Sequence, residues 1–205
     1  MGQLRNMGNN EEEKMHNLDD LLEKAKWSKL TDEELNYVVR KIENPSLRGK
    51  YELYTLIFIL GKAKATQHRK LVESFLYYPK DPMISKIAVQ TLCGFWNLGR
   101  DYLKELRAFV KGVEWDKEED VRLVAISCAG PLLSQIKDKE LMELLLDIFE
   151  NYSESEYSQG SDYDDIFKEA AYESLADSVG IRWSEANGMD PQVIEKARQL
   201  IKTIK

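Results

Sequence analysis

Few residues of this 205-residue chain could carry out catalysis. Its two histidines are His16 and His68, and its two cysteines, Cys93 and Cys128, lie among apolar residues of predicted helices. A thiol nucleophile needs a neighbouring base and access to solvent, and we expect these thiols to be buried. The sequence also lacks the H-E-x-x-H, C-x-x-C, G-x-S-x-G, P-loop and G-x-G-x-x-G motifs. We therefore expect a protein that is not an enzyme, with no cofactor and no metal site.

Acidic side chains are the other candidates, and they gather in one segment. Residues 138–165 contain ten acidic side chains and one lysine, a net charge of −9, whereas the whole chain carries −7. The remaining residues therefore sum to +2. In the first half of the segment the acids recur at steps of three and four residues, which places them on one face of a helix. These acids are Glu140, Glu143, Asp147 and Glu150.

The second half of the segment, residues 151–165, mixes acids with tyrosines. The spacing of Asp162, Asp164 and Asp165 lacks the glycine and the terminal bidentate glutamate that a calcium-binding loop requires, so we do not expect a calcium site. Tyrosine offers a large rigid surface and one polar group, which suits protein interfaces. The alternative is that the acidic helix face is only solvated and the loop is a disordered insertion. The residues predicted to contact a partner here are Tyr152, Tyr157, Tyr163, Asp164 and Asp165.

The elements that must position this segment repeat along the chain. Leu47, Ile84 and Val121 are spaced 37 residues apart. Each begins a stretch whose apolar residues recur at intervals of three and four residues. A fourth copy aligns Phe167 with Val121 after an insertion of about nine residues. A second apolar helix follows in every copy, and the last of these helices opens with Asp190-Pro191. The pattern predicts an all-α chain of stacked helical hairpins.

Helix-start residues support these boundaries. Asn44-Pro45 and Asp81-Pro82 place a capping side chain directly before a proline at the first helical position. Upstream, residues 18–27 and 31–43 form one more hairpin, in which Thr31 and Glu34 have the spacing of a capping box. This hairpin lacks the repeat pattern, so we expect it to cap the array.

Two of the copies resemble the first helix of a HEAT repeat. The resemblance rests on Asp81-Pro82-Met83-Ile84-Ser85-Lys86-Ile87-Ala88 with Leu92, and on Glu119-Asp120-Val121-Arg122 with Ala125. It extends over residues 44–205, although the period is slightly shorter than the ~40–47 residues usual for the family. It implies a right-handed α-solenoid of about five antiparallel helical hairpins. Second helices line the concave face of such solenoids, which would place the acidic helix inside the curve.

The expected organisation is a flexible tail, 1–17, followed by one domain, 18–205. The domain divides into a capping hairpin, four repeats and an acidic inserted loop. Their boundaries are 18–43 for the hairpin, 44–80, 81–117, 118–152 and 166–205 for the repeats, and 153–165 for the loop.

The leading hypothesis is a protein-binding module whose acidic concave surface engages a basic protein. Small acidic solenoids suit bacterial immunity proteins that cover basic toxin domains, an analogy of size, charge and fold. The longest apolar stretch, Leu53–Leu60, is too short to cross a bilayer, and buried free thiols fit a reducing cytoplasm. We therefore expect a cytoplasmic protein without a membrane partner.

The alternative is a HEAT-like nucleic-acid enzyme such as a DNA glycosylase. It requires a basic face, with aromatic residues such as Trp96, Trp115 and Trp183 directed at the base. The net charge of −7 disfavours a polyanionic partner. The residues that could form the basic face are His68, Arg69, Lys70, Arg100, Lys104, Arg107 and Lys111.

Overall fold

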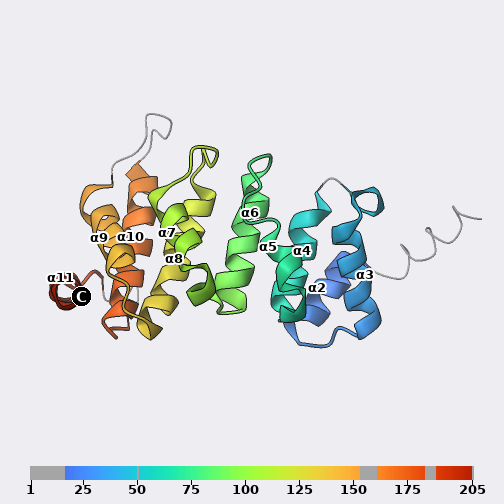
Figure 1. Cartoon of the computed structure of the whole chain (residues 1–205), viewed down its shortest axis with the longest axis horizontal. Helices are drawn as coiled ribbons and strands as arrows, with labels where there is room; N and C mark the ends of the chain where they lie inside the picture. Colours follow the sequence, from blue (N-terminus) through green and yellow to red (C-terminus); the bar gives the residue numbers. More distant parts are fainter. Residues whose placement is uncertain (1–16, 50, 153–160, 183–187, 205) are drawn as a thin grey trace, which may run out of the picture.

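The computed structural model describes residues 17–49, 51–152, 161–182 and 188–204. Within these ranges the chain forms α-helices joined by short 3₁₀ and π turns, and contains no strand. The predicted all-helical class is confirmed. Figure 1 shows the helices side by side along the long axis of the molecule, in the order of the sequence from α2 and α3 at one end to α11 at the other.

The described helices pack in two layers. One layer contains α4, α6, α8 and α10, each packed on the next, and the other contains α7, α9 and α11. Buried side chains of both layers, among them Leu56, Ile87, Leu106 and Leu133, form one continuous core. The bounds are α2 (Leu18–Lys26), α3 (Asp32–Glu43), α4 (Glu52–Lys62), α5 (Arg69–Glu73), α6 (Pro82–Val89), α7 (Leu103–Lys111), α8 (Asp120–Gln135), α9 (Lys139–Asn151), α10 (Ser161–Ser178) and α11 (Pro191–Thr203).

Three helices begin as the sequence predicts. Before α3, the Thr31 hydroxyl accepts the Glu34 N–H at 3.2 Å and the Glu34 carboxylate accepts the Thr31 N–H at 2.9 Å, which is the predicted capping box. Before α6 and α11, Asp81 and Asp190 each accept a backbone N–H from the first turn, with proline at the first helical position.

The helix expected at the start of the predicted 44–80 repeat begins later than the sequence indicates. Asn44 caps only a 3₁₀ turn, Pro45–Leu47, and α4 starts at Glu52. The reason is Arg48, whose backbone is extended and whose guanidinium donates to the Lys41 carbonyl oxygen at 3.1 Å and to that of Ile42. These carbonyl groups lie at the end of α3 and have no partner within the helix, so Arg48 stabilises this helix end. With the extended backbone that this contact requires, the next helix does not start directly after Asn44.

The cap of α8 comes from Asp116, four residues before the helix begins. The backbone of Glu119 adopts the left-handed conformation, and its side chain provides no capping hydrogen bond. Instead the Asp116 Oδ2 accepts the N–H groups of Val121 at 2.9 Å and Arg122 at 3.0 Å. Asp116 is buried, and this burial raises the pKa of its carboxyl group.

The last repeat departs from the predicted pattern in two ways. Helix α10 starts at Ser161, so the last five residues of the predicted 153–165 loop are helical. Helix α11 is seen end-on in Figure 1, whereas α8, α9 and α10 lie in the plane of the view. It therefore crosses α9 instead of running alongside it, and this crossing shapes the hollow described below.

A close approach between α8 and α10 gives a first prediction. These two helices share the largest helix–helix contact, and a Cβ on Gly130 would lie 2.8 Å from the Asp177 carboxylate and 3.0 Å from the Ser174 Cα. We expect Gly130→Ala to lower the free energy of unfolding by ~1–3 kcal/mol, because overpacking outweighs the better helix propensity of alanine. Urea denaturation measures the change.

Gly94→Ala is the matched control for this prediction. A Cβ on Gly94 would meet its nearest atom, the Cys128 Sγ, at an ordinary 3.6 Å. We therefore expect its stability to stay within about 1 kcal/mol of the wild type. Equal losses in both variants would contradict the close-approach explanation.

Candidate interaction groove

Helix α9 is fixed at its start by a buried carboxylate. The Asp138 Oδ1 accepts the N–H of Leu141 at 2.9 Å, and the Arg107 guanidinium of α7 donates to both oxygens of Asp138. Leu141, Leu145 and Ile148 then face the core. Because the acids alternate with these residues at helical spacing, they emerge on the opposite face of α9.

Three of the four predicted acids line one hollow. Glu143, Asp147 and Glu150 of α9 face Arg198 and Lys202 of α11 across a groove of about 320 Å³. Its apolar floor is formed by Leu146, which is half-buried, and Ile201, which is buried. We call this hollow the α9–α11 groove.

Glu140, the fourth acid, lies apart from the groove. Its carboxylate is 2.7 Å from the Lys111 amine and 2.9 Å from the Arg107 guanidinium, both on α7. The hydrogen bond from Lys111 and the charge of Arg107 lower the pKa of Glu140. Glu140 thus joins α9 to α7 and is not available in the groove.

The charges within the groove are unevenly paired. Glu150 forms a 2.5 Å ion pair with Arg198 across one end. Glu143 has only a distant ion pair, 3.9 Å, with Lys139 on its own helix, and Asp147 accepts a hydrogen bond from Asn151 at 2.9 Å. Among the described residues Lys202 forms no ion pair. Within the described residues, the groove therefore keeps two carboxylates and one ammonium group that form no ion pair with each other.

The predicted tyrosines do not join this groove in the described part of the chain. Tyr152 is half-buried, its ring stacks on Phe167 at 4.6 Å, and its hydroxyl donates to Glu119. The Arg122 guanidinium lies 5.2 Å from the same ring. Tyr152 therefore joins α8, α9 and α10. Tyr157 lies outside the described residues, and Tyr163, Asp164 and Asp165 are described only as backbone of α10.

Both cysteines are buried free thiols, as predicted. Burial raises the pKa of both thiols, that of Cys128 to about 12. A thiol with so high a pKa is a poor nucleophile at neutral pH. The described residues also contain no group of three or more side chains that could hold a metal ion.

Three of the seven basic residues that a nucleic-acid enzyme would need form ion pairs with acids. Arg69 pairs with Glu73 at 2.8 Å and with Asp101 at 2.6 Å, and Arg107 and Lys111 pair with acids of the α9 segment. The aromatic residues are also engaged: Trp96 is buried and Trp115 packs edge-on against Phe109. Trp183 lies outside the described residues.

A second row of acids on α10 was not predicted from the sequence. Glu169, Glu173 and Asp177 are spaced four residues apart and form no ion pair within the described ranges. Burial, with the charges of Asp177 and Glu169, raises the pKa of Glu173. The same four-residue spacing that revealed the acids of α9 would have revealed this row.

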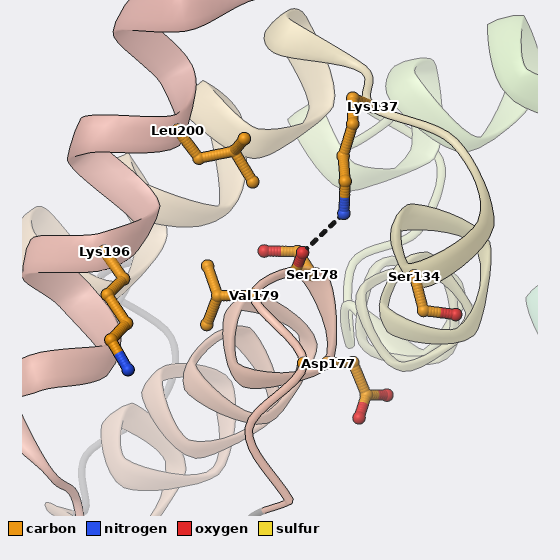
Figure 2. Close-up of a pocket in the computed structure, with 8 residues that line it drawn as sticks. Ser134, Lys137, Asp177, Ser178, Val179, Lys196 and Leu200 are labelled. Atoms are coloured by element: carbon orange, nitrogen blue, oxygen red, sulfur yellow. Dashed lines mark hydrogen bonds between the residues drawn. The ribbon is translucent and has the colours of Figure 1, made fainter.

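A further hollow, of about 470 Å³, lies where α8 and α10 end beside α11 (Figure 2). The Lys137 amine crosses it and donates to the carbonyl oxygens of Ser178 at 2.6 Å and Leu133 at 3.2 Å. Lys196 and Asp177 lie on opposite sides of the end of α10 in Figure 2. Lys137 thus donates hydrogen bonds to backbone carbonyl groups at the C-terminal ends of two helices, α8 and α10, which is a structural role.

Comparison with known proteins adds no relative, since no family model, no curated protein and no solved structure matches the sequence. Across the described ranges, every helix is too short or too polar to traverse a lipid bilayer. The functional argument therefore depends on the α9–α11 groove and its surroundings.

Proposed function

We propose that this chain is a non-catalytic protein-binding module that engages a basic protein partner through the acidic face of α9. The observation that supports the proposal is the α9–α11 groove, in which Glu143 and Asp147 stand one helical turn apart and, within the described part of the chain, neither forms an ion pair shorter than 3.9 Å. Carboxylates placed this way attract a cationic surface and steer its approach.

A HEAT-like α-solenoid is the architecture that we propose for this module. Its support is the packing of α4, α6, α8 and α10 in one layer, where each helix contacts the next helix of the same layer. In the other layer α7 packs on α9. Repeat arrays bury their core through such nearest-neighbour contacts. A module of this kind, cytoplasmic and acidic, would suit an immunity protein that covers a basic toxin domain, a subtype that rests on analogy.

The test is affinity capture from a nuclease-treated lysate of the source organism, with three baits. The first is the wild type, the second Glu143→Lys with Asp147→Lys, and the third Glu169→Lys with Glu173→Lys. The third bait has the same charge change at the same spacing on α10. We expect one stoichiometric basic protein with the first and third baits, and its loss with the second.

Either of two results would refute the proposal. One is capture of the same protein by all three baits, which would make the acidic face of α9 a solvated surface. The other is retention of nucleic acid from an untreated lysate with no protein partner. Glu140 and Glu150 are left unchanged because their ion pairs hold α9 to α7 and α11.

A further inference from the structure

The groove has a shape and a charge distribution that select one kind of side chain. The Glu150–Arg198 ion pair joins its two helices, and Leu146 and Ile201 give its lining an apolar part. The acidic wall carries Glu143 and Asp147. An occupant that complements both parts must combine an apolar stem with a cationic end.

Two ordinary side chains have this form, lysine and arginine. The ammonium group of lysine is a compact point charge, whereas the arginine guanidinium is a planar fork with five N–H donors. Glu143 and Asp147 lie four residues apart on one helix face, so the carboxylates are neighbours that one fork can bridge. The guanidinium is also more weakly hydrated than an ammonium group, so its removal from water costs less free energy.

We propose that the α9–α11 groove seats a single arginine side chain of the partner protein, with its stem over Leu146 and its guanidinium between Glu143 and Asp147. This inference rests on the proposed protein-binding function and names the residue type that the groove recognises. Lys202, on the opposite wall, repels the incoming cation and sets an upper limit on its affinity.

The probe is N-acetyl-arginine amide, titrated into the full ¹⁵N-labelled chain over the millimolar range. We expect saturable amide shifts in residues 143–150 and 198–202. N-acetyl-lysine amide is expected to bind several-fold more weakly at the same residues, because it can form only one of the two paired contacts. N-acetyl-norleucine amide, which has the stem without the charge, is expected to produce no saturable shift.

Three variants make the test specific. Glu143→Gln with Asp147→Asn should weaken arginine binding about tenfold or more, since hydrogen bonds to charged groups are lost. Lys202→Gln should strengthen it about two- to threefold, as expected for an exposed charge. Glu169→Gln with Glu173→Gln removes the same charge from α10 and should leave binding unchanged, because neither residue lines the groove.

The proposal is overturned by shifts that never saturate, by saturable shifts outside the groove, or by equal weakening in the α9 and α10 variants. These outcomes are separable from failure of the proposed function. A basic partner that depends on Glu143 and Asp147, combined with no arginine binding in the groove, rejects only the arginine seat. Arginine binding in the groove without any captured protein rejects the protein-binding function.

Discussion

Replacing Phe109 with alanine is expected to lower the free energy of unfolding by about 3–5 kcal/mol, the usual cost of a large cavity in a packed core. Phe109 is fully buried on α7. Its ring lies 5.1 Å from that of Tyr77 and 6.3 Å, edge-on, from that of Trp115. The substitution removes the ring that joins the segment between α5 and α6 to the loop before α8, and the neighbouring side chains cannot fill the cavity unless both segments move.

Urea denaturation and thermal melting both measure this change. For a chain of this size each kcal/mol corresponds to roughly 2–4 °C in Tm, so the loss should exceed about 6 °C. Trp27→Ala is the control, because Trp27 is 71% exposed and its removal creates no cavity. Its stability should stay within about 0.5 kcal/mol of the wild type. A comparable loss in both variants would show that burial does not explain the effect.

Replacing Arg107 with methionine is expected to have the second-largest effect. Asp138 is buried, and Arg107 supplies its counter-charge while Asp138 caps α9. Removing one partner of a fully buried pair costs about 3–5 kcal/mol. Because roughly a third of the Arg107 side chain is exposed, solvent screens the remaining carboxylate and we expect about 2 kcal/mol.

The double variant Arg107→Met with Asp138→Asn separates pairing from packing. Asparagine keeps an oxygen to accept the Leu141 N–H but carries no charge. We therefore expect the double variant to be more stable than Arg107→Met alone, as measured by urea denaturation. If it is less stable, the loss in the single variant comes from packing of the arginine stem. Binding of the arginine probe should survive in both, because neither residue lines the groove.

Local rules were enough to predict several elements. The capping box of Thr31 and Glu34 and the cap–proline pairs before α6 and α11 depend on residues within one turn, and the structure contains each of them. The buried stripe of α9 and the opposed acids likewise follow from helical spacing. The arrangement of the acids in a groove could not be derived in this way.

Several differences come from contacts that reach beyond a single helical turn. Arg48 reaches back to the carbonyl groups that end α3, and the first repeat therefore begins late. Glu140 and Glu150 face cations on α7 and α11, 29 and 48 residues away, which a charge count along α9 cannot show. The groove itself exists because α11 crosses α9, and no residue of α11 alone indicates that crossing.

The layered packing also separates the two ends of the molecule energetically. Helices α2 and α3 reach the rest of the chain through α4, while the groove lies at the opposite end, between α9 and α11. Opening of a helix at one end breaks contacts with its neighbour and leaves distant helices in place. Amide hydrogens of α2 and α3 can therefore exchange with solvent while those of α8 and α10 stay protected. A chain frayed at the α2 end would still keep a formed groove for the proposed partner.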